Sequence, residues 1–314
     1  MTDTILALDG VSKTFKSKPA VTDLSLEVRR GQITGFLGPN GAGKTTSLRM
    51  SLGILAPDSG QVSLFGGPPR ASALDRVGFL PEERGIYRKM KVIDVIVFFA
   101  RLKGVDTATA RQRGLVMLDE FGLADVADAK VKTLSKGMAQ KIQIIATLVH
   151  EPEFIILDEP FSGLDPVNQS ALEQVVRKQA QAGRTILFST HVMEHAERLC
   201  DKIVLIAKGR KAFDGTVSEA LARVPRRVLL ETADCADLGS ILSGLGSVRR
   251  ESEDGRDIQV VELAAGADAQ DVLKALVAKD VKLTRFEPVR AQLHDAFVQL
   301  VGSPAETPAQ SETV

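Results

Sequence analysis

The sequence has few cysteines, no net charge and no long apolar run, and each absence excludes a class of protein. Only Cys200 and Cys235 occur, in no CxxC pair and with no histidine at ligand spacing. That usage predicts a reduced cytosolic protein without disulfides or a structural metal. Forty basic residues balance forty acidic ones, so the net charge favours neither nucleic acid nor an anionic membrane surface as a partner. We expect no nucleic-acid partner.

Membrane insertion is disfavoured as well. The N-terminus lacks a basic start followed by a long apolar run, so we expect no secretory signal. The most apolar segment, Val92 to Ala100, contains an aspartate and has about half the length that a membrane-spanning helix needs. We therefore expect that the chain does not cross a membrane on its own.

Strand-like runs alternate with helical patterns through about the first 220 residues. This alternation is typical of an α/β domain with a largely parallel sheet. The main predicted strands cover residues 31–38, 153–160, 184–190 and 201–209. Since ligands of such sheets collect at the carboxyl ends of the strands, we expect the chemistry at the turns that follow these runs.

The pattern changes after residue 222. Residues 223–302 read as strand, helix, strand, strand, helix, strand, which predicts a small α+β domain of the ferredoxin-like split type with one extra helix at its end. That last helix carries an apolar stripe, which either covers its own domain or offers a docking face to a partner subunit; the stripe consists of Leu293, Ala296, Phe297, Leu300 and Val301. The small polar residues of 303–314 predict a disordered tail.

One glycine-rich loop follows a predicted strand and opens a helix. The stretch "GPNGAGKT" fits the phosphate-loop pattern G-x-x-x-x-G-K-[ST] in the context that it requires. Its backbone N–H groups would converge on phosphate oxygens, while Lys44 reaches the β and γ phosphates and Thr45 offers a hydroxyl to Mg²⁺. The predicted nucleotide-binding residues here are Gly38, Pro39, Asn40, Gly41, Ala42, Gly43, Lys44, Thr45 and Thr46.

A second motif, "FIILDEP", places two acidic residues at the end of an apolar strand. Alone, such a pair is usually a solvated turn. Combined with a phosphate loop, it favours a catalytic role, in which Asp158 lies beside Mg²⁺ and Glu159 acts as the general base that polarises a water for attack on the γ phosphate.

With further motifs in register, the chain resembles the nucleotide-binding subunit of ATP-binding cassette (ABC) transporters over about its first 220 residues. "LSKGM" (134–138) resembles the family signature LSGGQ, "SGLDP" (162–166) the D-loop, and "STH" (189–191) the switch-histidine loop. The resemblance implies that His191 contacts the γ phosphate, that Phe15 stacks on adenine, and that Ser135, Gly137 and Asp165 take part in nucleotide binding. Lys136 and Met138 depart from the signature, but the serine and the second glycine remain.

The resemblance also implies an activity, partners and a location. Family members hydrolyse ATP as head-to-tail dimers around two ATP molecules, so we expect a homodimer or a heterodimer that powers a separate integral membrane permease at the cytoplasmic face of the membrane. A helical subdomain, about residues 88–150, and the loop before it would receive a cytoplasmic helix of that permease. A cassette followed by a small domain resembles prokaryotic exporters of the sodium-extrusion and drug-efflux type. The alternative is a soluble cassette ATPase that acts as an assembly or translation factor.

Glu82 stands where most relatives have the Q-loop glutamine. A carboxylate keeps an oxygen ligand but adds a charge near the phosphates, and a charge at about 4 Å is worth about 4 kcal/mol at an effective dielectric of about 20. Either Glu82 contacts Mg²⁺ in the closed dimer, which we favour, or it turns away and pairs with a neighbour such as Arg84. The expected Mg²⁺ ligands are thus Thr45, Glu82 and Asp158. Nearby basic residues, Arg84, Arg88, Lys89 and Lys91, form either a solvated face or contacts to the permease.

One competing pattern remains. "HVMEH" (191–195) also satisfies the H-x-x-E-H pattern of zinc peptidases. In the cassette interpretation His191 ends a strand, whereas Glu194 and His195 begin the next helix and are expected to face solvent.

Overall fold

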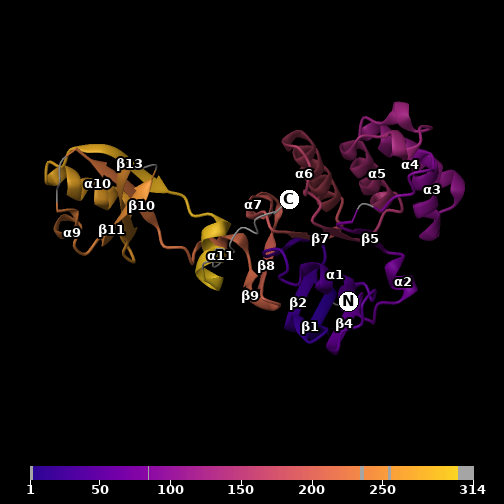
Figure 1. Ribbon diagram of the computed structural model, residues 1–314, viewed down its shortest axis with the longest axis horizontal. Helices are drawn as coiled ribbons and strands as arrows, with labels where there is room; N and C mark the ends of the chain where they lie inside the picture. Colours follow the sequence, from indigo (N-terminus) through magenta and orange to yellow (C-terminus); the bar gives the residue numbers. More distant parts are fainter. Residues whose placement is uncertain (1–2, 84, 234–236, 254–255, 303–314) are drawn as a thin grey trace, which may run out of the picture. The chain divides into compact units, whose positions relative to one another are not determined.

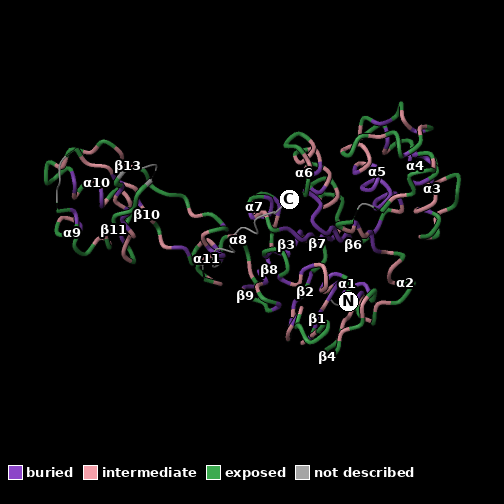
Figure 2. The backbone as a smooth tube through the Cα atoms, in the orientation of Figure 1, coloured by how far each residue is buried: buried purple, intermediate pink, exposed green. Residues whose placement is uncertain are grey.

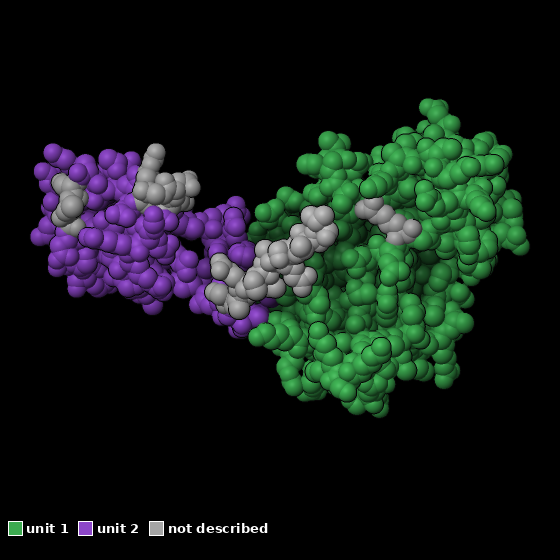
Figure 3. Space-filling view, viewed as in Figure 1, with its two compact units in different colours: residues 1–217 green, residues 218–314 purple. Residues whose placement is uncertain are grey.

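A computed structural model describes residues 3–83, 85–233, 237–253 and 256–302. The chain forms two compact units, residues 1–217 and 218–314 (Figure 3). The division falls at the start of helix α8 (Val217–Leu221), whereas the sequence pattern placed it after residue 222.

The first unit is built on a six-stranded sheet with the order β5-β6-β7-β3-β8-β9. Its strands are parallel except β9, which runs antiparallel to β8. Every residue of β3, β6 and β7 is buried, because both faces of a parallel sheet are covered. The predicted, largely parallel sheet is therefore confirmed; its strands are β3 (Ile33–Leu37), β5 (Val77–Leu80), β6 (Phe154–Asp158), β7 (Thr185–Thr190), β8 (Lys202–Ala207) and β9 (Arg210–Gly215).

A second, antiparallel sheet of three strands lies beside helix α1 (Lys44–Ser51). It consists of β2 (Lys18–Arg29), β1 (Thr4–Phe15) and β4 (Ser59–Leu64). One apolar core joins this sheet, α1 and the parallel sheet, through residues such as Leu24, Leu48 and Val204. Helices α6 (Pro166–Gln181) and α7 (Met193–Leu199) lie on the opposite side of the parallel sheet from α1 (Figure 1). The short helix α2 (Ala71–Leu74) contacts β5.

A helical part is inserted between β5 and β6. It consists of α3 (Val92–Leu102), α4 (Thr107–Glu120), two 3₁₀ turns (Ala124–Val126 and Val131–Thr133) and α5 (Lys136–Leu148). These elements share a core of their own that includes Ile93, Ile96, Leu118, Ile142 and Ile145, and their buried sides face one another (Figure 2). In the described ranges of the chain, no helix has the length and apolar character needed to cross a membrane.

The second unit contains one four-stranded antiparallel sheet with the order β11-β12-β10-β13. Its elements follow the predicted order, and helix α11 is the expected extra helix: β10 (Arg227–Thr232), α9 (Leu238–Ile241), β11 (Gly246–Glu253), β12 (Arg256–Leu263), α10 (Ala269–Ala278), β13 (Leu283–Val289) and α11 (Leu293–Val301). In the stripe of α11, Leu293, Ala296 and Phe297 are buried. Cys235, Arg84 and the predicted tail 303–314 lie outside the described residues.

Candidate active site

The phosphate loop joins β3 to α1, and two of its glycines are required by close approaches. A Cβ at Gly38 would lie 2.2 Å from the carbonyl oxygen of Ile206. At Gly43 the backbone has φ 105° and a Cβ would lie 2.5 Å from the carbonyl oxygen of Ala20. Such a backbone can turn tightly into the N-terminus of α1, where free N–H groups and the helix dipole favour phosphate.

Lys44, the first residue of α1, is only 5% exposed. Its Nζ donates to the carbonyl oxygens of Gly38 at 2.8 Å and Pro39 at 3.2 Å. Nζ also lies 3.1 Å from Glu159 Oε1, although Oε1 accepts no hydrogen bond, so this contact is an ion pair without hydrogen-bond geometry. A buried ammonium needs such a counter-charge. Thr45 and Thr46 follow in the first turn of α1, both half-buried.

The two acidic residues at the end of β6 meet the neighbouring strand β7 through one serine. Ser189 is fully buried; its Oγ donates to Asp158 Oδ1 at 2.6 Å and accepts from the Glu159 N–H at 2.9 Å. The sequence marked Ser189 only as part of the switch-histidine motif. Its role as the link between both acidic residues follows from the register, which pairs Asp158 with Ser189.

His191 follows β7 and completes this arrangement. Its Nδ1 lies 2.9 Å from Glu159 Oε2, and its side chain is 43% exposed while that of Glu159 is 6% exposed. One carboxylate is thereby flanked by Lys44 and His191. The structure thus brings together Lys44, Asp158, Glu159 and His191 from three separate motifs.

A pocket of about 150 Å³ opens next to these carboxylates, lined by Glu82, Asp158 and Glu159 among others. Glu82 is exposed and, among the residues that the structure describes, forms no hydrogen bond or ion pair. Pairing of Glu82 with Arg84 falls outside the described residues, so the orientation of Glu82 stays a prediction. Among the described residues, the side-chain hydrogen bond to Asp158 engages Oδ1, which leaves its second oxygen for a cation. Together with the Thr45 hydroxyl, this donor set fits Mg²⁺, which takes oxygen ligands and only one or two carboxylates.

A second group of predicted residues lies at the N-termini of α5 and α6. Ser135 caps α5 by accepting from the Met138 N–H. Asp165 caps α6 through Asn168, and the N–H of Asn168 holds the pKa of the Asp165 carboxyl below its usual value. A Cβ at Gly137 would lie 3.3 Å from Asn168 Nδ2, so the two helix ends adjoin. Within the described part of the chain, no hydrogen bond or ion pair joins this group to the phosphate loop.

Phe15 occupies the last position of β1 with its side chain free on one side. It is 47% exposed, and Lys13 Nζ lies 5.9 Å from the centre of its ring. An exposed aromatic face of this kind is a suitable platform for stacking a base. Its contact with adenine stays a prediction.

A second pocket, of about 120 Å³, lies beside the first. Both pockets are lined by Leu80, Pro81 and Gln143, so one set of side chains contributes to both walls. The second pocket is otherwise mostly apolar and also contains Lys103 and His150. Burial, and then the positive charge of Lys103, lowers the pKa of His150 to about 4, which keeps the ring neutral at neutral pH.

The basic residues near this second pocket behave differently from one another. Lys91 forms an ion pair with Asp128 at 3.0 Å. Arg88 and Lys89 are exposed. The contact of Arg88 and Lys89 with a permease stays a prediction.

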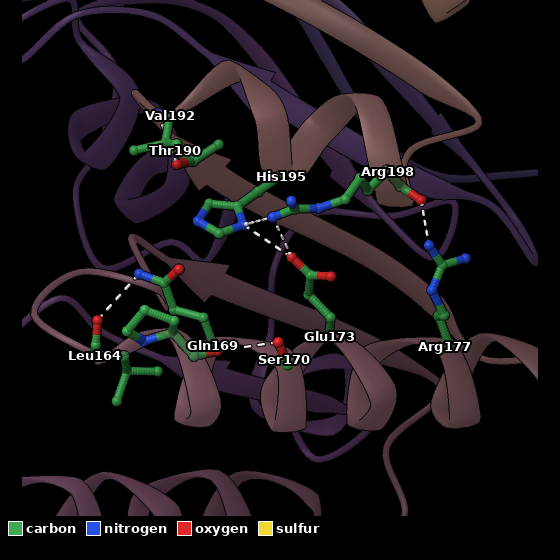
Figure 4. A network of polar contacts seen from close by, with 10 residues as sticks. Leu164, Gln169, Ser170, Glu173, Arg177, Thr190, Val192, His195 and Arg198 are labelled. Carbon is green, nitrogen blue, oxygen red and sulfur yellow. Dashed lines mark hydrogen bonds and ion pairs between the residues drawn. The ribbon is translucent and has the colours of Figure 1, made fainter.

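The expectation that His195 faces solvent is wrong. His195 is only 3% exposed; its Nδ1 lies 3.0 Å from Glu173 Oε1 of α6, toward which the ring points (Figure 4). The reason is packing, because α7 lies against α6 and the sheet, and the position after exposed Glu194 turns inward. His191 and His195 therefore engage different carboxylates, and the described residues contain no group of three or more His, Cys, Asp or Glu side chains arranged to hold a metal.

A parallel sheet, a phosphate loop after β3 and two acidic residues at the end of β6, with β7 between these two strands, define a P-loop nucleotide-binding cassette. Residues 21–162 match the family model described as ABC transporter. The ABC transporter ATP-binding protein YhaQ of Bacillus subtilis is 40% identical over 95% of this chain and 99% of its own length. The Nod factor export ATP-binding protein I of Ralstonia nicotianae is 40% identical over 69% of this chain and 68% of its own. The chain belongs to the family of ABC transporter ATP-binding subunits.

Solved structures agree with this assignment. A structure titled as the ATP binding subunit of an ABC transporter superposes with a TM-score of 0.66 and 30% sequence identity, and the match covers 70% of this chain and 93% of that one. Proteins of this family bind ATP and work with membrane permeases, and the resemblance stated from the motifs is confirmed.

Proposed function

We propose that the chain binds and hydrolyses ATP and thereby powers a separate membrane permease. The observation that carries this proposal is the buried Glu159 carboxylate, flanked by Lys44 at 3.1 Å and His191 at 2.9 Å. A carboxylate in this position, one residue after the proposed Mg²⁺ ligand Asp158 of a phosphate-loop protein, is suited to accept a proton from an attacking water.

Each residue has a separate task in this proposal. The phosphate loop binds the phosphates through its backbone N–H groups, and Lys44 exchanges its contact with Glu159 for contacts with the β and γ phosphates. Thr45, Asp158 and Glu82 would hold Mg²⁺, which when bound neutralises part of the phosphate charge. Glu159 then accepts the proton of the water, while His191 orients the carboxylate and contacts the γ phosphate.

Dimerisation completes the site. The group formed by Ser135, Gly137 and Asp165 sits at the N-termini of α5 and α6 and has no polar contact to the phosphate loop within the described chain. A head-to-tail dimer would bring this group of one subunit onto the nucleotide held by the other, so that the helix N-termini face the γ phosphate. A homodimer would contain two complete sites. A heterodimer with a related chain is the alternative.

The second pocket is the proposed contact with the permease. Three residues, Leu80, Pro81 and Gln143, line both this pocket and the pocket that contains Glu159. A helix of the permease bound there would press on the wall of the catalytic pocket, which offers a route for coupling. One relative is named a Nod factor export protein, which supports export rather than uptake by this chain. We place the chain at the cytoplasmic face of the membrane.

ATP hydrolysis by the purified chain with Mg²⁺ tests the proposal. Glu159→Gln should bind ATP but hydrolyse it about a hundredfold or more slowly, the order lost when catalytic proton transfer is removed. It should also accumulate as an ATP-dependent dimer in analytical ultracentrifugation. Glu194→Gln makes the same chemical change at an exposed position and serves as the matched control.

Two results would contradict the proposal in different ways. Turnover of Glu159→Gln close to that of the unaltered chain refutes the role of general base. Sedimentation of the chain with ribosomes, and no membrane association when a candidate permease is co-expressed, refutes transport and favours the alternative of an assembly or translation factor.

A further inference from the structure

Glu159 has an unusual backbone for a residue of its size. Its φ is 47°, in the left-handed region that side-chain-bearing residues adopt rarely and at a cost. Such a conformation persists only where the surroundings impose it. The turn that carries the proposed general base must therefore be held by its neighbours.

Three successive residues of this turn are held by three different elements. The Glu159 N–H donates to Ser189 Oγ of β7 at 2.9 Å. Gln140 Nε2 of α5 donates to the carbonyl oxygen of Pro160 at 2.6 Å. The ring of Phe161 stacks on His195 of α7, with centroids 4.0 Å apart and planes at 14°.

His195 is fixed on its other side. Its Nδ1 lies 3.0 Å from Glu173 Oε1, and Arg198 Nη2 lies 2.7 Å from the same oxygen (Figure 4). Phe161 in turn meets the edge of Phe188, at 5.8 Å and 80°. The imidazole of His195 is therefore a fixed stacking partner for Phe161, because both its ring face and its polar edge have partners.

Gln140 is only 5% exposed, and its Oε1 is a buried atom for which the described residues offer no hydrogen-bond partner. An unsatisfied amide oxygen in the interior is unfavourable, so what this side chain contributes is the donation from Nε2. Gln140 lies in the second turn of α5, the helix that Ser135 caps. Helix α5 thus connects the signature residue Ser135 at its N-terminus to the carbonyl group of Pro160, the residue that follows Glu159.

We propose that Gln140 and His195 are positioning residues of the ATPase. They act together with Ser189 to hold the turn of Glu159, Pro160 and Phe161 in its strained conformation, and Gln140 makes the placement of the general base depend on the position of the signature helix α5. This inference rests on the proposed hydrolysis with Glu159 as the base.

The first test compares Gln140→Leu with the unaltered full-length chain under saturating and limiting Mg-ATP. We expect kcat to fall about tenfold while the KM for ATP changes by less than about twofold, because the phosphate loop is untouched. Thr147→Val is the matched control, since it removes a buried hydroxyl of the same helix that donates only to the Gln143 carbonyl oxygen at 2.8 Å. An unchanged kcat in Gln140→Leu, or an equal loss in Thr147→Val, overturns the role of Gln140.

The second test distinguishes the effect of the flat ring of His195 on kcat from the effect of its side-chain volume. His195→Phe keeps a flat ring for Phe161 to stack on and should retain most of kcat, whereas His195→Ala should lose about tenfold. Because the alanine variant removes a buried ring and could unfold, His195→Leu provides a side chain of larger volume without a flat face and should resemble alanine in kcat. Equal kcat values for the phenylalanine and leucine variants overturn the role of the ring.

The third test asks whether the effect passes through Glu159. In the Glu159→Gln background, Gln140→Leu should lower single-turnover hydrolysis no further, because residues that act as a unit are not additive. A full additive loss overturns the inference. If the unaltered chain hydrolyses no ATP, the proposed function itself fails, whereas hydrolysis that is insensitive to Gln140 refutes only this inference.

Discussion

Removal of the Ser189 hydroxyl gives the sharpest prediction for stability. Ser189 is fully buried, and its Oγ joins the Asp158 carboxylate at 2.6 Å to the Glu159 N–H at 2.9 Å. Ser189→Ala therefore leaves one buried N–H without a partner and removes one hydrogen bond to a carboxylate. Each of these losses costs about 1–3 kcal/mol. Because water can enter the adjoining pocket and satisfy part of the lost hydrogen bonding, we expect a total loss of about 3 kcal/mol, near the lower end of the sum.

Calorimetry can measure this loss. For a unit of about 217 residues, each kcal/mol shifts the unfolding midpoint by about 2–4 °C, so Ser189→Ala should lower the midpoint of the first unit by about 8 °C. Calorimetry is preferred because the chain contains no tryptophan and one tyrosine, which makes fluorescence a weak probe. Ser189→Cys, with a weaker donor of similar shape, should lie between serine and alanine.

Ser170→Ala is the matched control. Its hydroxyl donates to the Pro166 carbonyl oxygen at an exposed position of α6, so its removal should stay within about 0.5 kcal/mol. If Ser189→Ala shifts the midpoint no more than Ser170→Ala does, the two buried groups have other partners, and the argument that Ser189 holds the turn is refuted.

Three further predictions concern binding and pH. Glu159→Gln removes the carboxylate that competes with phosphate for Lys44. The attraction between Lys44 and Glu159 is worth about 5 kcal/mol before solvation at an effective dielectric of about 20, so a non-hydrolysable ATP analogue should bind to Glu159→Gln about tenfold tighter. Weaker binding would contradict the proposal that Lys44 exchanges Glu159 for phosphate. Phe15→Ala should weaken ATP binding about tenfold or more while Phe15→Trp preserves it, since stacking on a base is worth about 1–3 kcal/mol; equal affinities would exclude the stack. His150 has a pKa of about 4 in the folded chain against 6.5 when unperturbed, so the unfolded state binds more protons between these values and stability falls as pH drops from about 6.5 to about 4. Thermal midpoints of His150→Asn should depend less on pH over that range, and an unchanged dependence would show that the ring is not held neutral.

The sequence predicted the parts of the fold that depend on local pattern. The apolar runs before residues 38, 160 and 190 form the buried strands β3, β6 and β7, because apolar periodicity and flanking turns are local properties of the chain. The order of elements in the second unit was predicted for the same reason, including the helix α11. The assignment of Lys44, Asp158, Glu159 and His191 to one site also came from motifs in register, and the structure joins these four residues through contacts.

Other features depend on which segments meet, which a local pattern does not contain. No local pattern predicts the burial of His195, because the inward face of a seven-residue helix is set by the neighbours on which it packs. The sequence did not single out Gln140, whose donation to the Pro160 carbonyl oxygen joins residues twenty positions apart.

The amino-acid sequence by itself therefore determined the chemistry of this protein: a glycine loop that admits phosphate, a lysine to bind it and a carboxylate to accept a proton. The tertiary structure decided how that carboxylate is held. The register of β6 and β7 places Ser189 beside Asp158, and the packing of α5 and α7 places Gln140 and His195 against the turn that follows. Long-range packing imposes the left-handed backbone of Glu159, because a local sequence that would adopt it unaided would require glycine at that position.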